Sequence, residues 1–178
     1  MSANDKTSVG SGPGNWQTPR DLFERLNRRF AFDYDAFASH ENALCRTYST
    51  VDGTFRAIRE YAPYPLEGSW MGRDQIDTLD GLRQDWDARR VFLNPPYSRG
   101  LIGAAVEKCA VSRNDAYMIA ALIPDARDTA WWRSFVKPYA QDFPIGRVRF
   151  INPVTGEPGA SPPGGIAVVV WTPDWMDR

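Results

Sequence analysis

The stretch that most constrains this chain is Val91-Phe92-Leu93, followed directly by Asn94-Pro95-Pro96-Tyr97. Three consecutive apolar residues predict a buried strand. The two prolines, which lack a backbone N–H, end its hydrogen-bonded ladder at Asn94. In open α/β sheets, ligands bind beyond the carboxyl ends of the strands. The sequence therefore predicts that an amide, two rigid carbonyl groups and an aromatic ring point into a cleft there.

The residue types in this turn suit one chemical problem. The exocyclic amino group of a heterocycle is a poor nucleophile, because its lone pair is delocalised into the ring. Two acceptors for its N–H bonds, the side-chain oxygen of Asn94 and the backbone oxygen of Pro95, would favour a pyramidal, more nucleophilic nitrogen. Proline offers a carbonyl without an N–H, and Tyr97 could stack on the ring for roughly 1–3 kcal/mol. A Pro-Pro-Tyr turn that only closes a strand is the other interpretation.

Apolar strands alternate with helical patterns along the rest of the chain. Thr18 fits a helix N-cap, with Pro19 at the first helical position and Asp21 completing a capping box, and Asp128 fits the N-cap of a later helix. Strands are predicted at Phe30–Phe37, Tyr117–Ile123 and Ile166–Trp171, and a helix at 101–112. This order predicts an α/β three-layer sandwich with a mixed sheet and a C-terminal antiparallel hairpin.

The length of 178 residues predicts one domain with a sizeable core. Residues 1–14 have almost nothing to bury, so we expect a disordered tail followed by a single domain over 15–178. Residues 49–75 show weak periodicity and carry no site prediction except a contribution to substrate contact. Residues 153–165 are rich in Pro, Gly and Ser, which predicts a long loop that is either a functional lid or a tolerated connection.

Composition narrows the possible functions. A net charge of −1 gives no global basic field, which argues against a tight non-specific DNA binder. The two cysteines lack a metal or redox spacing, so free thiols and a cytoplasmic location are expected. One histidine argues against a histidine-based metal site, and no apolar run approaches the ~20 residues of a membrane span. Several arginines are expected near the predicted cleft: Arg89, Arg90, Arg99, Arg127 and Arg133.

Asn94 to Tyr97 after an apolar strand resembles the catalytic motif of amino-methyltransferases that use S-adenosylmethionine. The whole chain resembles the small phage-type DNA N6-adenine methyltransferases, the phage Dam family. Besides Asn94-Pro95-Pro96-Tyr97, the pieces that carry this resemblance follow in order and cover nearly everything from residue 15: Trp16–Pro19, Phe32–Ala36, Asp80–Leu82 with Trp86, Leu122–Pro124 with Asp128-Thr129, and Gly146–Phe150. The resemblance implies a Rossmann-like methyltransferase fold.

The resemblance also implies roles for residues outside the turn. Gln17, Thr18 and Pro19 would meet the amino-acid end of S-adenosylmethionine, although they could equally be a plain helix start. A carboxylate at a strand end is the usual partner of a nucleotide ribose, so Asp35 is the expected ribose ligand; the alternative is a cap for the following helix. The missing Gly-rich phosphate loop fits a cofactor without phosphate.

Two further residues are expected near the cofactor adenine. The resemblance places Asp80 and Trp86 there, since an indole face and a nearby acceptor can hold an adenine. A tryptophan that covers the edge of the core is the alternative interpretation of Trp86.

The resemblance thus implies transfer of a methyl group from S-adenosylmethionine to adenine N6 in DNA by direct attack, on a base that is flipped out or single-stranded. Cytosine-C5 methylation is disfavoured, because neither Cys45 nor Cys109 follows a proline. Methylation of an RNA base or a protein glutamine, and a non-catalytic nucleic-acid-binding module, stay open. The recognition sequence and the oligomeric state cannot be read from the sequence.

Overall fold

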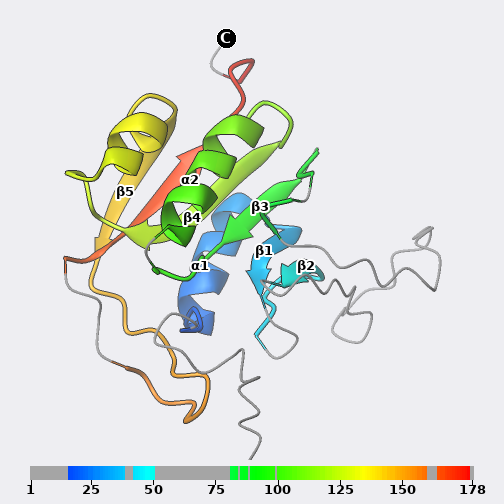
Figure 1. The fold of residues 1–178 in the computed structure, drawn as a ribbon. Helices are drawn as coiled ribbons and strands as arrows, with labels where there is room; N and C mark the ends of the chain where they lie inside the picture. Colours follow the sequence, from blue (N-terminus) through cyan, green and yellow to red (C-terminus); the bar gives the residue numbers. More distant parts are fainter. Residues whose placement is uncertain are drawn as a thin grey trace, which may run out of the picture.

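The computed structural model describes residues 16–38, 42–50, 81–83, 85–87, 89–98, 100–159 and 164–176. The tail predicted for residues 1–14, most of 49–75, and Asp80 and Arg99 lie outside these residues. The described residues form a mixed α/β fold around a six-stranded mixed sheet, as predicted (Figure 1). None of the helices in this part of the chain is long and apolar enough to cross a membrane.

The sheet has the spatial order β2-β1-β3-β4-β6-β5. Four neighbouring strands, β2, β1, β3 and β4, are parallel, whereas β6 runs antiparallel to both β4 and β5. In chain order the elements are α1 (Arg20–Phe30), β1 (Tyr34–Ala38), β2 (Thr47–Thr50), β3 (Arg90–Leu93), α2 (Leu101–Ser112), β4 (Met118–Pro124), the π-helical turn η1 (Trp132–Val136), β5 (Ala140–Gly146) and β6 (Ile166–Trp171).

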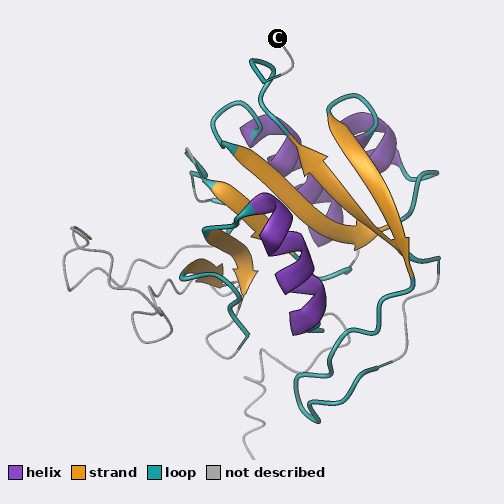
Figure 2. Cartoon of the chain, turned by 180° about the vertical axis from the view of Figure 1, so that it is seen from behind, coloured by secondary structure: helices purple, strands orange, loops and turns teal. Residues whose placement is uncertain are grey.

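Helices cover both faces of the sheet and create two cores. In Figure 1 α2 lies in front of the sheet, and Figure 2 shows α1 on the opposite face. The first core joins α2 and η1 to the sheet, and the second joins α1 to the other face. Neighbouring strand residues divide between them, so Leu93 lies in the first core and Phe92 in the second. Alternation along β3 explains this division.

The bounds of α2, β4 and β6 confirm the predicted helix and two of the predicted strands, but three local predictions were wrong. Helix α1 begins at Arg20 with Pro19 as its N-cap, and no side chain caps it. Phe30 ends α1 instead of opening a strand, since Ala31 adopts a left-handed conformation (φ 51°) and Asn27 Oδ1 accepts from the Phe32 N–H. The sequence pattern therefore failed at both ends of α1: no side chain caps its first turn, and its last residue was assigned to the next strand.

At the later helix, Thr129 replaces the predicted cap Asp128. The Thr129 hydroxyl oxygen accepts from the Trp132 N–H at 3.4 Å, and the segment that follows is a π-helical turn. The predicted strand Phe30–Phe37 corresponds to β1, which begins later, at Tyr34, and ends at Ala38. Strand β2 was not predicted, because its four residues carry no clear period.

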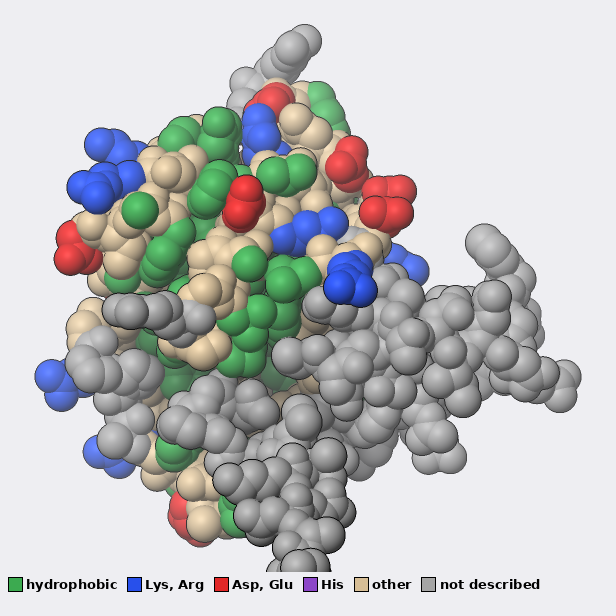
Figure 3. Space-filling model, in the orientation of Figure 1, with side chains coloured by type: hydrophobic (Ala, Val, Ile, Leu, Met, Phe, Trp, Pro, Cys, Tyr) green, Lys and Arg blue, Asp and Glu red, His purple; other side chains and the backbone are tan. Residues whose placement is uncertain are grey.

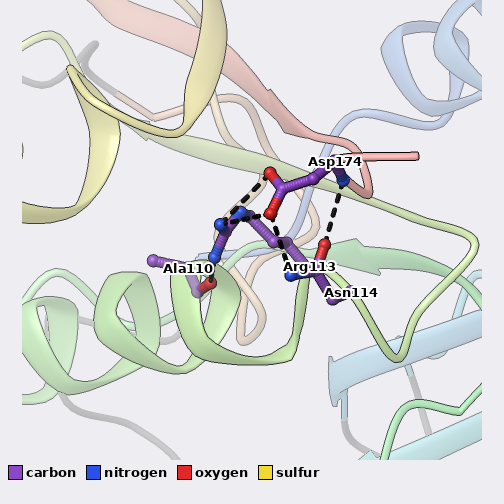
Figure 4. Close-up of polar contacts among 4 residues, drawn as sticks. All are labelled: Ala110, Arg113, Asn114 and Asp174. Carbon is purple, nitrogen blue, oxygen red and sulfur yellow. Dashed lines mark hydrogen bonds and ion pairs between the residues drawn. The ribbon is translucent and has the colours of Figure 1, made fainter. Parts of the chain in front are cut away.

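The turn after β6 is fastened to the end of α2 (Figure 4). Arg113 donates from one guanidinium nitrogen to the Ala110 carbonyl at 2.9 Å, and from another to Asp174 Oδ2, also at 2.9 Å. Asn114 donates to the same carboxylate oxygen at 3.1 Å and accepts from the Asp174 N–H at 2.9 Å. We call Arg113, Asn114 and Asp174 the C-terminal lock. It lies at the amino end of β4, because Trp171 at the end of β6 pairs with Ile119.

Candidate active site

A hydrogen-bonded chain of neutral groups forms where β3 ends. Asn94 Nδ2 donates to the Trp16 carbonyl oxygen at 3.1 Å. The Tyr97 hydroxyl lies 3.2 Å from Asn94 Oδ1 and 3.2 Å from the Leu122 carbonyl, and it can donate to either. Because the Trp16 carbonyl can only accept, it fixes the orientation of the Asn94 amide, with Oδ1 turned away from it. Two backbone positions far apart in the sequence thus hold the two side chains of the predicted turn.

The Tyr97 ring lies between the two cores and contacts residues of both. It forms a T-shaped contact with the Phe150 ring, with ring centroids 6.0 Å apart and an interplanar angle of 83°. Burial raises the pKa of the Tyr97 hydroxyl well above its usual value, so the group stays a hydrogen-bond donor at neutral pH. Phe150 and Leu122 therefore set the direction of the ring that the sequence predicts to stack on a base.

Two acceptors keep spare capacity at this strand end. An amide oxygen has two lone pairs, so Asn94 Oδ1 can accept a second hydrogen bond besides that of Tyr97. Pro95 is buried, and among the described residues no donor reaches its carbonyl oxygen. Pro96 is half-buried and, like Pro95, holds φ fixed. Each of these two acceptors can therefore take one further hydrogen bond without breaking a contact of its own.

The N-terminal segment forms one wall of the site. Gln17 and Ile151 exchange both backbone hydrogen bonds at 2.9 Å, which places Trp16 beside Asn94. A Cβ on Gly159 would lie 2.1 Å from the Trp16 ring, so only glycine allows this approach. Thr18 is buried. The structure thus places Trp16 and Gln17 beside the turn through contacts with residues 150–159, and the role of Gln17, Thr18 and Pro19 at the cofactor stays a prediction.

Asp35 lies in β1, beside β3, in register with Phe92. It is the second residue of the strand and not at its carboxyl end, and only 3% of its surface is exposed. Its carboxylate accepts from the Leu44 N–H at 3.2 Å and the Phe37 N–H at 3.4 Å. Burial outweighs both hydrogen bonds and raises the pKa of Asp35 to about 7. In the described part of the chain, no cationic side chain forms an ion pair with it.

The segment around Trp86 packs against the same strand. A Cβ on Gly81 would lie 2.0 Å from the Ala36 carbonyl oxygen, so this glycine sits directly on the residue after Asp35. Trp86 itself is only 1% exposed and lies in the first core. Among the described residues its indole nitrogen has no hydrogen-bond partner, and the Lys108 ammonium lies 5.3 Å from the ring centroid. This burial is typical of a core tryptophan, and its predicted neighbour Asp80 lies outside the described residues.

Two of the arginines expected near the cleft serve other purposes. Arg90 opens β3 at the opposite end, where it donates to the Phe30 carbonyl at 2.9 Å and lies over the Tyr117 ring at 4.1 Å. The Arg127 Nε atom pairs with Asp125 at 2.9 Å, and its guanidinium also pairs with Asp142. Arg133 is exposed on η1.

The two thiols are equally removed from any chemistry. Burial raises the pKa of Cys45 and of Cys109 well above the usual value, so neither is a thiolate at neutral pH. Among the residues for which the structure gives positions, no three His, Cys, Asp or Glu side chains form a group that could hold a metal ion.

Sequence reasoning missed four parts of this site: the carbonyls of Trp16 and Leu122, the close approach of Gly81, and the ring of Phe150. The carbonyls have no signature, because every residue carries one. Gly81 was interpreted only as part of a turn. Phe150 belongs to a stretch that resembles the phage Dam family but was given no role.

A comparison with known families supplies independent information. A family model described as DNA N-6-adenine-methyltransferase (Dam) matches residues 7–57 and 75–177, which is most of the chain. It spans Trp16, Asp35, the Asn94–Tyr97 turn and Phe150. No curated protein matches the sequence.

Proposed function

The chain belongs to the DNA N-6-adenine-methyltransferase (Dam) family, which implies DNA adenine methyltransferase activity, and from this premise we propose that it transfers a methyl group from S-adenosylmethionine to the N6 amino group of adenine in DNA. The single observation that carries the proposal is the spare acceptor capacity at the end of β3. Asn94 Oδ1 and the Pro95 carbonyl are two acceptors on adjacent residues, as an amino group with two N–H bonds requires.

Residues 15–178 are proposed to act as one catalytic domain. The strand order supports this, because an antiparallel strand, β6, extends a parallel sheet and leaves the carboxyl ends of β1 and β3 side by side. Ligands of open α/β sheets bind at such an edge.

Asn94 and Pro95 are proposed to act on the amino group of the target base. Hydrogen bonds from both N–H groups to these oxygens draw the nitrogen lone pair out of conjugation, and they strengthen as the nitrogen becomes tetrahedral. They are therefore worth more in the transition state than in the ground state, which is the condition for catalysis. Pro96 keeps the turn rigid, and Tyr97 offers its ring as a stacking partner in a site that holds a flipped or single-stranded adenine.

S-adenosylmethionine would supply an electrophilic methyl group on its sulfonium sulfur. The amino nitrogen would form the new N–C bond as the S–C bond of the sulfonium breaks, and its extra proton would pass to water, because neither the Asn94 amide nor the Pro95 carbonyl is basic. Asp35 fits one part of this cofactor, since a buried carboxylate without a cationic partner can accept from the hydroxyl groups of a ribose. Gln17, Thr18 and Pro19 are proposed to meet its amino-acid end.

Trp86 and Asp80 were expected to hold the adenine of the cofactor. Trp86 is buried in the first core, which favours the alternative interpretation of a core tryptophan. Its contribution is proposed to be indirect, through the packing of the Gly81 segment against β1.

The test is a transfer assay with S-adenosylmethionine that carries a tritiated methyl group. Purified protein is incubated separately with unmethylated DNA, with RNA and with a glutamine-containing protein extract, and the labelled nucleosides are separated. We expect label in N6-methyladenine from DNA. Label only in cytosine, RNA or protein would contradict the proposal, and cofactor binding without transfer to any acceptor would favour a non-catalytic module.

A further inference from the structure

The segment that connects β5 to the active site carries two arginines whose charges are not neutralised. Residues 147–150 alternate between exposed and buried: Arg147 and Arg149 face solvent, whereas Val148 and Phe150 enter the second core. In an extended chain, alternate residues lie on the same side and roughly 6.6 Å apart. Among the described residues, neither guanidinium has an acidic partner.

The inward-facing residues fix this segment to the site. The Phe150 ring packs in a T-shaped arrangement against the Tyr97 ring, with the two ring centroids 6.0 Å apart. The next residue, Ile151, pairs with Gln17. Gly146, at the end of β5, pairs with Ile166, which in turn pairs with Pro124 at the carboxyl end of β4. Arg147 and Arg149 therefore stand at the site end of the sheet, and Arg149 adjoins a residue that contacts the predicted stacking ring.

The acidic side chains of the nearby helix α1 do not pair with Arg147 or Arg149. The two acids of α1, on the same face of the sheet, are already engaged: Glu24 pairs with Arg20 at 3.3 Å, and Asp21 pairs with Arg25 at 3.8 Å. Figure 3 shows Lys and Arg side chains in separate groups on the face that it draws, with no continuous basic field. Among the described residues, the charges of Arg147 and Arg149 are therefore not cancelled by an ion pair.

We propose that Arg147 and Arg149 bind the phosphates of the DNA strand beside the target adenine and so align that base with Asn94 and Tyr97. The proposal rests on the proposed function and names the surface through which the substrate backbone is held. Phosphates follow one another along a strand at about 3.4 Å of rise in a duplex. Two arginines on one side of an extended segment can thus meet nearby phosphates, while carrying no sequence information themselves.

The experiment compares three exposed Arg→Gln variants: Arg147→Gln, Arg149→Gln and, as a matched control, Arg28→Gln. Arg28 is exposed in the last turn of α1, near the end of β3 that lies away from the site. DNA affinity is measured by fluorescence anisotropy at several salt concentrations, beside kcat and KM for methyl transfer. Melting temperatures verify that all variants are folded.

Each lost phosphate contact should make the slope of log K against log salt less steep by about 0.9 for a duplex. At ~0.1 M salt, this slope corresponds to about 8-fold weaker binding for one contact. We expect this change in Arg147→Gln and Arg149→Gln, with KM for DNA raised and cofactor affinity unchanged, and no change in Arg28→Gln.

The possible outcomes separate this proposal from the proposed function. Wild-type slopes in both site variants, in a protein that methylates DNA, would overturn the phosphate contact and leave the function standing. An equal loss in Arg28→Gln would also overturn it, since only overall charge would then matter. A wild-type protein that neither binds nor methylates DNA would overturn the function itself.

Discussion

The two ends of the sheet each hold a polar network, and the two networks differ in kind. In the C-terminal lock, at the amino end of β4, Arg113 pairs with the Asp174 carboxylate, and Asn114 forms two hydrogen bonds with Asp174. At the carboxyl end, the network around Asn94 contains only neutral groups, and two of its bonds run to backbone carbonyls. Both networks connect residues far apart in the sequence.

The difference lies in what each network leaves unused. The Asp174 carboxylate receives hydrogen bonds from both Arg113 and Asn114, and Asn114 also accepts from the Asp174 backbone, so the lock is closed on itself. Asn94 Oδ1 and the Pro95 carbonyl retain acceptor capacity beside a half-buried ring. A polar network by itself thus indicates only structure, whereas oriented groups with remaining capacity indicate a ligand. Substitutions in the network around Asn94 and in the C-terminal lock test this difference.

The largest expected effect separates the two asparagines. Asn94→Ala should lower kcat at least about 100-fold, the magnitude seen when one pre-organised transition-state partner is removed, while cofactor affinity stays near wild type. Asn114→Ala is the matched control, and its kcat should be unchanged. Steady-state kinetics with tritiated methyl transfer measures both. Equal activity of the two variants would remove the distinction between the two ends.

The next effect concerns the cofactor. Asp35→Ala should weaken S-adenosylmethionine binding about 10- to 150-fold, equivalent to about 1.5–3 kcal/mol for a lost charge-assisted hydrogen bond. The loss in affinity should exceed any loss of rate at saturating cofactor. Isothermal calorimetry measures the affinity, and Asp174→Ala, which removes a carboxylate from the lock, is the control. Unchanged affinity in a folded Asp35 variant would refute the ribose role.

A smaller effect should separate the role of the Tyr97 ring from that of its hydroxyl. Tyr97→Ala should raise KM for DNA by about tenfold, which corresponds to about 1.4 kcal/mol of stacking, and should also lower kcat. Tyr97→Phe keeps the ring and its contact with Phe150, so it should retain much of the activity; the lost hydroxyl only frees Asn94 Oδ1 and the Leu122 carbonyl. If the Phe variant is as inactive as the Ala variant, the hydroxyl and not the ring carries the role.

A separate expected effect is on stability and comes from inside the sheet. The pKa of Asp35 is raised to about 7 in the folded protein, so between about pH 4 and pH 7 the folded state binds a proton that the unfolded state has lost. Stability should therefore be highest below this window and fall as pH rises through it. The melting temperature of Asp35→Asn should depend less on pH over the same range.

Asp33 does not complicate that comparison. Its pKa is also raised, mainly by burial, and it contributes equally to wild type and variant. Parallel melting curves from pH 5 to pH 8 for the two proteins would contradict the assigned pKa of Asp35. A difference would show that this carboxylate is kept in the sheet at a cost to stability, as expected for a group retained for binding.

Features that depend on neighbours along the chain could be predicted from the sequence. The apolar runs at 91–93, 117–123 and 166–171 had to be buried strands, and the prolines after Asn94 had to end the first of them. The mixed sheet followed from the order of these elements. The composition of the Asn94–Tyr97 turn was enough to suggest what it would bind, because amide and proline carbonyl groups carry their chemistry wherever they are placed.

Contacts between groups far apart in the sequence became visible only in the folded protein. The amide of Asn94 donates to the carbonyl oxygen of Trp16, which lies 78 residues earlier. The hydroxyl of Tyr97 contacts the carbonyl oxygen of Leu122, which lies 25 residues later. Such contacts depend on strand order and register, which no local pattern encodes. Burial is likewise a property of the whole fold, so neither the raised pKa of Asp35 nor the closed position of Trp86 could be read from the chain.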